Sequence, residues 1–191
     1  MINFAVYCSA SSESTNFNQS GENIAKYISK HHGNLIYGGS NTGLMAVTAK
    51  NVHDLGGKVI GVIPEFMKNE DLVSPLNDET YVVKTMEERK EKMAELADVC
   101  IALPGGVGTL EEITEIMSWD RLGKIQTPYF FYNYNGFYQF LEKFIDQMVA
   151  DDLLSASDRK RIHFIKDLKE ADNYLRNYQA TNFHQFSKEN D

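Results

Sequence analysis

The stretch Asp98-Val-Cys-Ile-Ala-Leu-Pro-Gly-Gly-Val-Gly-Thr-Leu-Glu-Glu112 decides the fold. Its apolar and β-branched run from Val99 to Leu103 predicts a buried strand, which Pro104 ends. Three glycines follow the strand: Gly105, Gly106 and Gly108. Glycines let the backbone turn tightly and let a ligand come close, while the free N–H groups at a helix start attract an anion. The stretch therefore predicts a strand, a phosphate-binding turn and the start of a helix.

The same stretch has a purely structural alternative. Thr109 and Glu112 have the Thr-x-x-Glu spacing of a capping box, in which the hydroxyl and the carboxylate satisfy N–H groups at the helix start. The three glycines favour a ligand site instead, because ligands in open α/β sheets bind outside the carboxyl ends of the strands.

Strand-like and helix-like segments alternate along the whole chain. This alternation predicts an α/β fold with a doubly wound parallel sheet in three layers, αβα, joined by right-handed crossovers. We expect one domain over residues 1–180, a polar tail over 181–191, and a lid or ligand loop over 65–79. Strands are predicted over 2–8, 35–37, 58–63, 81–83, 99–103, 128–132 and 162–165, and helices over 17–31, 44–52, 86–97, 137–154, 168–175 and from Thr109 to near Gly123.

Composition excludes several classes of function. The chain has 191 residues and a formal net charge of −8, so it lacks the basic surface that nucleic acids and anionic membranes require. No apolar run reaches the roughly 18 residues of a membrane span. Cys8 and Cys100 lie in separate predicted strands, which indicates core thiols and a reduced, cytoplasmic protein. The five histidines have no zinc-like spacing, so we expect no metal site.

Common nucleotide motifs are absent. Glu111 stands where the dinucleotide fingerprint needs a third small residue, and no acidic residue follows at the distance that a ribose contact requires. The nucleoside triphosphatase loop and the serine hydrolase elbow are missing too. What remains is a phosphate-binding turn, for which we expect no redox cofactor.

Arg89 and Lys90 begin the helix that precedes the glycine turn. A cation near a helix N-terminus opposes the helix dipole, which costs a few tenths of a kcal/mol unless an acid or a ligand uses it. A solvent-exposed face is the alternative interpretation for these two residues.

The segments Leu103-Pro-Gly-Gly-Val-Gly-Thr-Leu-Glu-Glu112 and Met86-Glu-Glu-Arg-Lys90 together resemble the Lonely Guy family of cytokinin riboside 5′-monophosphate phosphoribohydrolases. Many members of that family once carried the label lysine decarboxylase. Tyr37-Gly-Gly39, Gly43-Leu-Met45 and Val59-Ile-Gly-Val-Ile-Pro64 extend the resemblance to about residues 2–150. It implies a Rossmann-like fold, a homodimer, and hydrolysis of the N-glycosidic bond of an N6-modified adenosine 5′-monophosphate to the free base and ribose 5-phosphate.

The resemblance also implies roles for individual residues. Arg89 and Glu112 would be the catalytic pair, with Glu112 stabilising positive charge on the ribose and orienting water. Arg89 would orient Glu112 or hold the substrate, because its high pKa makes it a poor general acid. Glu87 replaces the histidine that the family has two residues before this arginine, so the charge near Arg89 and the base preference are expected to differ. The residues that would bind the substrate are Gly105, Gly106, Gly108, Thr109, Met86, Lys90, Glu111 and Ser118.

Two other functions stay open from the residues alone. A nucleotide-binding or sensing module with little turnover would use the same fold. A decarboxylase would need a lysine bonded to pyridoxal phosphate, and no lysine has a recognisable setting for that group.

The apolar residues of the helix after Thr109 favour a homodimer, although the core could use them too. These residues are Ile113, Ile116, Met117 and Trp119.

Overall fold

A computed structural model describes residues 1–11, 15–68 and 72–178. The predicted tail, 181–191, lies outside these residues. Seven strands are described: β1 Asn3–Tyr7, β2 Asn34–Tyr37, β3 Val59–Pro64, β4 Glu79–Val83, β5 Val99–Ala102, β6 Tyr129–Tyr132 and β7 His163–Ile165. The helices are α1 Asn18–Lys30, α2 Gly43–Asp54, α3 Met86–Leu96, α4 Val107–Arg121, α5 Gln139–Ala150, α6 Ala156–Arg159 and α7 Leu168–Asn177, with 3₁₀ turns η1 Glu65–Met67 and η2 Tyr134–Gly136.

The strands form one parallel sheet in the order β4-β3-β2-β1-β5-β6-β7. β1 lies in the middle, where Phe4 pairs with Leu35 of β2 on one side and with Val99 of β5 on the other. The chain thus winds outward from β1 to β4, returns, and winds outward the other way from β5 to β7. This order confirms the predicted doubly wound sheet.

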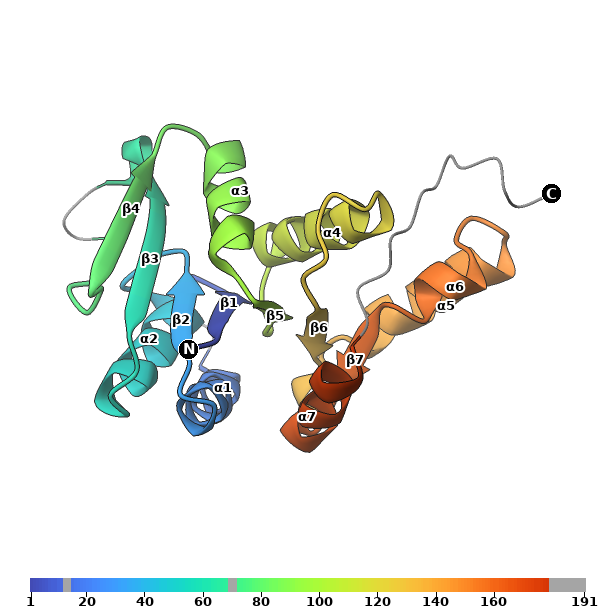
Figure 1. Cartoon of the computed structure of the whole chain (residues 1–191), viewed down its shortest axis with the longest axis horizontal. Coiled ribbons are helices and arrows are strands. Elements are labelled where there is room, and N and C mark those ends of the chain that lie inside the picture. The colour runs from blue at the N-terminus through green and yellow to red at the C-terminus, as the bar shows by residue number, and fades with distance from the viewer. Residues whose placement is uncertain (12–14, 69–71, 179–191) are drawn as a thin grey trace.

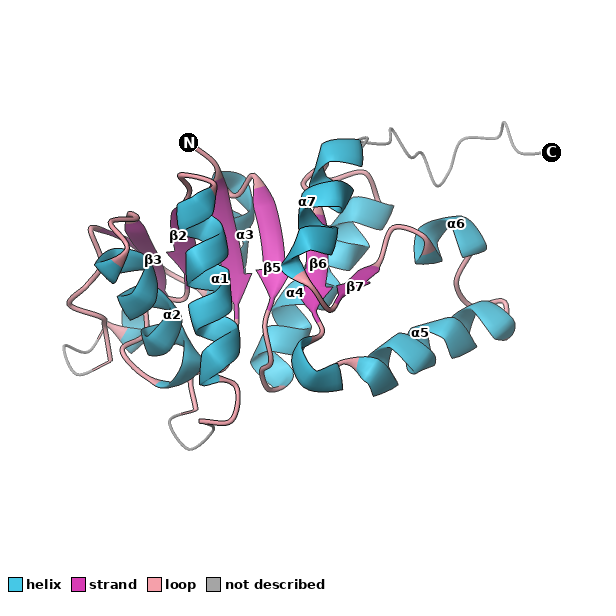
Figure 2. Cartoon of the chain, turned by 90° about the horizontal axis from the view of Figure 1, so that it is seen from below, coloured by secondary structure: helices cyan, strands magenta, loops and turns pink. Residues whose placement is uncertain are grey.

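Helices cover both faces of the sheet, as Figures 1 and 2 show. One core contains Ile24 of α1 and Leu44 of α2, together with Ala171 of α7. The opposite core contains Met93 of α3 and Ile113 of α4, packed on alternate residues of the same strands. Side chains of a strand point to opposite faces in turn, so each strand supplies both cores. The three αβα layers are confirmed.

Some predicted boundaries are wrong for local reasons. Pro64 is the last residue of β3 and does not lie beyond it. The helix expected over 137–154 is shorter: α5 begins at Gln139 after the non-helical cap Tyr138, and it ends at Ala150, just before Asp152 takes a left-handed conformation (φ 57°). In the described ranges, no helix combines the length and apolar character needed to cross a lipid bilayer.

Candidate active site

The glycine turn lies at the switch point of the sheet, beside the carboxyl ends of β1 and β5, where such sheets bind ligands. Hydrogen bonds from neighbouring elements hold the chain just before the turn. The N–H of Ser9, in the loop after β1, donates to the carbonyl of Pro104 at 3.3 Å. The hydroxyl of Tyr138 donates to the carbonyl of Leu103 at 2.6 Å. Neighbouring elements on both sides therefore fix the position at which the turn begins.

Helix α4 starts directly from this turn. Gly106 is its N-cap, and no side chain of the described residues accepts a hydrogen bond at this end. The first N–H groups of α4 are thus available to an anion. A Cβ atom added at Gly106 or Gly108 would meet no atom within 4 Å, so both glycines border open space. The turn can therefore accept a ligand close to its backbone.

The capping-box alternative is wrong. Because α4 begins at Val107, Thr109 and Glu112 are the third and sixth residues of the helix rather than its cap and third residue. Thr109 is buried, and its side chain fills the space beside the Cα of Gly105. The carboxylate of Glu112 therefore does not cap α4 and can bond to another element.

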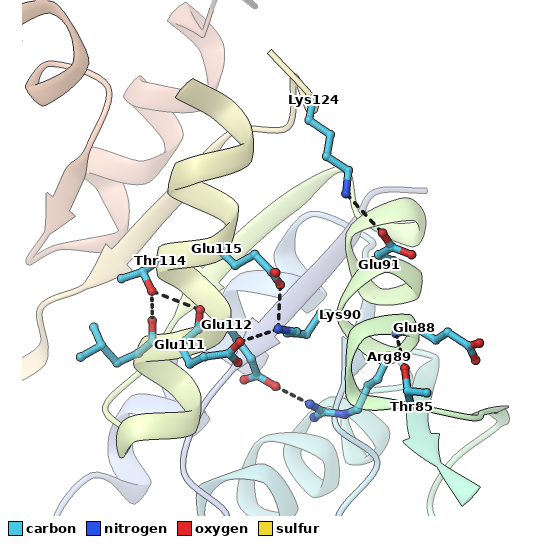
Figure 3. A network of polar contacts seen from close by, with 11 residues as sticks. Thr85, Glu88, Arg89, Lys90, Glu91, Glu111, Glu112, Thr114, Glu115 and Lys124 are labelled. Carbon is cyan, nitrogen blue, oxygen red and sulfur yellow. Dashed lines mark hydrogen bonds and ion pairs between the residues drawn. The ribbon is translucent and has the colours of Figure 1, made fainter. Parts of the chain in front are cut away.

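Glu112 forms a buried ion pair with Arg89 of α3 (Figure 3). Only 6% of Glu112 and 5% of Arg89 is exposed. The Nη1 of Arg89 donates to Oε1 of Glu112, and its Nε donates to the carbonyl of Val62 in β3 at 3.1 Å. A guanidinium held at two edges has little freedom to turn, so Arg89 presents a fixed charge to the carboxylate.

Burial raises the pKa of Glu112 above its ordinary value. The charge and hydrogen bond of Arg89 act in the opposite direction and offset only part of this effect. A carboxylate with such a pKa holds and releases a proton closer to neutral pH than an exposed glutamate does. Buried carboxylates with this property are typical of active sites.

Lys90 makes a second link between α3 and α4, next to the first (Figure 3). Its ammonium pairs with Glu111, and with Oε2 of Glu115 at 3.1 Å. Burial by itself lowers the pKa of Lys90, but the hydrogen bonds and charges of the two glutamates raise it overall. Lys90 is therefore held as a cation, and the two links fix α3 against the second and third turns of α4.

The other predicted site residues are distributed unevenly. Met86 is half-buried at the start of α3, one turn before Lys90. Ser118 is exposed and lies ten residues after Gly108 on α4, a separation of about 15 Å along the helix axis. The structure thus brings the glycine turn, Arg89 and Glu112 together, but it does not bring Ser118 to them within one chain.

Glu87 is exposed in the first turn of α3. Hydrogen bonds from its own backbone N–H and from the Thr85 side chain lower its pKa, so it is a charged residue at the helix start. The residue that replaces the family's histidine is therefore an anion near neutral pH.

The loops after β1, β2 and β3 meet beside the glycine turn. Thr42 donates its hydroxyl to the carbonyl of Ala10 at 2.8 Å, and the N–H of Met45 donates to the carbonyl of Ser9 at 3.2 Å. Of the predicted 65–79 loop, residues 69–71 lie outside the described residues. The N–H of Ser74 donates to the carbonyl of Gly39 at 2.8 Å, so the end of this loop is tied to the β2 loop.

A cavity of about 470 Å³ lies elsewhere, against α7. Its lining includes Tyr129 and His163, the first residues of β6 and β7. These residues lie at the amino ends of the strands, whereas the glycine turn lies at the carboxyl ends. Ligands in this kind of fold bind at the carboxyl ends of the strands, so the cavity does not compete with the site around Glu112. Among the described residues, no cluster of three or more His, Cys, Asp or Glu side chains could hold a metal ion.

Sequence reasoning missed two contributors to this site. The carbonyl of Val62 holds Arg89, and Glu115 pairs with Lys90. A main-chain carbonyl leaves no mark in a sequence. Glu115 lies one turn after Glu111, and this i, i+4 spacing on one face of α4 was the available signal.

Comparisons with known proteins identify the relatives of this chain. The family model described as "possible lysine decarboxylase" matches residues 45–175. The cytokinin riboside 5′-monophosphate phosphoribohydrolase LOG5 of Arabidopsis thaliana is 35% identical over 178 residues, which cover 93% of this chain and 78% of that protein. The cytokinin riboside 5′-monophosphate phosphoribohydrolase of Rhodococcoides fascians is 37% identical over 168 residues, covering 87% and 85% of the two chains.

Solved structures support the fold alone. The molybdenum cofactor carrier protein of Chlamydomonas reinhardtii superposes with a TM-score of 0.68 at 22% identity, over 94% of this chain and 99% of that one. DNA processing protein A of Helicobacter pylori superposes with a TM-score of 0.56 at 15% identity, over 93% and 82%. At these identities the likeness says nothing about which ligand is bound.

Proposed function

Because the chain belongs to the Lonely Guy family of cytokinin riboside 5′-monophosphate phosphoribohydrolases, we propose that its enzymatic activity is centred on the Arg89–Glu112 pair. It is a hydrolase that cleaves the N-glycosidic bond of a cytokinin-type adenosine 5′-monophosphate and releases the base and ribose 5-phosphate. The buried ion pair beside an open glycine turn is the observation that carries the residue assignment.

The reaction breaks the bond between the base nitrogen and C1′ of the ribose. Positive charge develops on the ribose as this bond lengthens, and the Glu112 carboxylate stabilises that charge and orients a water molecule. The water oxygen bonds to C1′ and loses a proton, the electron pair of the broken C1′–N bond leaves with the base, and the base takes up one proton, so that one water is added across the bond. A guanidinium is a poor general acid, so the role of Arg89 is to orient Glu112.

The 5′-phosphate would lie at the glycine turn. Gly105, Gly106, Gly108 and Thr109 form the turn and the first turn of α4, where free N–H groups and the helix dipole favour an anion. Phosphate bound there would hold the ribose in place over Glu112, one turn further along the helix. Met86, Lys90, Glu111 and Ser118 remain proposed contacts of the substrate.

The older decarboxylase description fits the residues less well. A lysine that forms an imine with pyridoxal phosphate has to lose its proton first. Lys90 is the lysine at this site, and its two glutamate partners keep its pKa above the ordinary value. A binding module with little turnover remains the competing function, and base release separates the two.

Base release from the wild-type protein is the test of the function. We expect free base and ribose 5-phosphate from AMP and from N6-isopentenyladenosine 5′-monophosphate in the absence of added cofactor, measured by chromatography of both products. The ratio of kcat/KM for the two nucleotides gives the base preference. Binding of either nucleotide without release of any product would favour the binding module and contradict the proposed hydrolase activity.

We also propose a homodimer that covers an apolar groove between α4 and α5. The groove is lined by Val107 and Leu110 of α4 and by Phe144 of α5, and α5 and α6 extend past the end of the sheet (Figures 1 and 2). Val107 is 88% exposed and Phe144 is 58% exposed, which is unusual for residues this apolar. Of the four residues expected at an interface, Ile113 and Ile116 are buried in the core, so they are not available to a partner.

A charge placed in this groove should separate the subunits. We expect the wild-type protein to sediment as a dimer at micromolar concentration and Phe144→Asp to sediment as a monomer, because a buried carboxylate has no partner there. Phe66→Asp is the matched control, since Phe66 is 71% exposed and lies on η1, outside the groove. A monomeric wild-type protein would contradict the proposal.

We propose the cytoplasm as the place of action. Cys8 and Cys100 are both buried and unpaired, which is typical of proteins that fold in a reducing compartment. Location of the tagged full-length protein by microscopy tests this.

A further inference from the structure

Gly38 follows β2, and the reason for a glycine there is space rather than backbone conformation. The next residue, Gly39, has a φ of +73°, which favours glycine, but Gly38 is not among the residues with positive φ. A Cβ atom added to Gly38 would lie closer than 3.0 Å to Nη2 of Arg89 and 3.1 Å from Sδ of Met45. The place of the missing side chain is thus occupied by the guanidinium of Arg89.

Arg89 has no room to yield without losing a contact. Its Nε is bound to the Val62 carbonyl and its Nη1 to Glu112, and Gly38 lies against the third nitrogen. A methyl group at position 38 would push the guanidinium, which is the end of a flexible side chain, and would leave the backbone in place. The Gly38→Ala protein should therefore fold, with Arg89 displaced relative to Glu112.

We propose that Gly38 is a positioning residue for Arg89: the absence of a side chain at position 38 sets where the guanidinium meets the Glu112 carboxylate. The expected effect on turnover rests on the proposed function. The effect on the ion pair does not, and it is measured separately.

Two readouts on Gly38→Ala test the proposal. For base release, kcat should fall about 100-fold while KM changes little, because a displacement near 1 Å at a reacting centre costs this much. The pKa of Glu112, followed by the pH dependence of its carboxyl signal in NMR, should rise, because Arg89 is the charge that opposes the effect of burial. A loss of packing alone would not move this pKa.

A double-mutant cycle identifies Arg89 as the intermediary. Lysine lacks the branched end of arginine, so Arg89→Lys removes the atom that the new methyl group would meet. In the Arg89→Lys background, Gly38→Ala should leave the unfolding midpoint and the pKa of Glu112 almost unchanged, whereas in the wild-type background it shifts both. Equal shifts in the two backgrounds would overturn the proposal.

Two controls separate this effect from ordinary crowding. Met45→Ala removes the other neighbour of position 38, and it should not restore the activity of Gly38→Ala; full restoration would assign the effect to Met45. Gly21→Ala crowds Thr48 Oγ1, at 2.7 Å from the new Cβ, away from Arg89, so it should lower the unfolding midpoint without moving the pKa of Glu112. If the wild-type protein releases no base, the hydrolase fails, while the pKa of Glu112 still decides the role of Gly38.

Discussion

Glu112→Gln should lower kcat for base release by about 10³-fold and leave nucleotide binding nearly intact. The amide keeps the size of the side chain and still accepts a hydrogen bond from Arg89, but it carries no negative charge to stabilise the ribose cation. Product release followed by chromatography gives kcat, and equilibrium dialysis of labelled nucleotide gives binding. Glu95→Gln is the matched control, because Glu95 lies on α3 with 69% of its side chain exposed and, among the described residues, pairs only with Lys92 at the surface.

Near-normal turnover by Glu112→Gln would remove Glu112 from the mechanism.

The pH profile of the wild-type protein gives an independent check on the role of Glu112. Since burial raises the pKa of Glu112, and since the ionised form is the active one, activity should decline with falling pH around a midpoint above the ordinary value of 4.5. A midpoint at or below that value would mean that a different group controls the acid side of the profile.

Arg89→Met should destabilise the protein by about 3–5 kcal/mol and abolish base release. Removal of one partner leaves the Glu112 carboxylate buried without its counter-ion, which is among the costliest changes in a protein interior. The carboxyl should then bind a proton more readily, because the charge that lowered its pKa is gone. Urea unfolding gives the free energy of unfolding, and Arg176→Met, an exposed arginine of α7, should change it by less than about 0.5 kcal/mol.

The double variant Arg89→Met/Glu112→Leu separates stability from catalysis. Two apolar side chains of similar size need no counter-ion, so the free energy of unfolding should return to about the wild-type value or exceed it. Base release should stay absent. A double variant as unstable as Arg89→Met would show that the cost comes from lost packing rather than from an unpaired charge.

The sheet and its layers could be predicted because their causes are local. Apolar runs such as Val99 to Leu103 and helical periodicity mark each element, and alternation of the two decides the topology. The predicted start of α4 lies two residues too late, because a Thr-x-x-Glu spacing indicates a cap whether or not the helix begins there. Such a signal cannot distinguish the first turn of a helix from the second.

The site was harder to predict because its contacts join distant elements. The resemblance paired Arg89 with Glu112, and their burial agrees with that pairing. Lys90 and Glu111 were expected to face the substrate, and the structure pairs them with each other. The contact of Arg89 with Gly38 depends on how β2, β3 and α3 pack, which no local pattern in the sequence records.

The sheet order also has a consequence for the way the chain folds. Phe4 pairs with Leu35, which follows it after one short β-α unit. Its other pairing partner, Val99, is separated from it by about half of the chain. Closing that long loop carries the larger entropic cost, so we expect β1–β4 to assemble first and β5 to join afterwards. Synthesis reaches Val83 before Glu112, so the growing chain contains all of the strands β1–β4 before it contains the proposed catalytic glutamate.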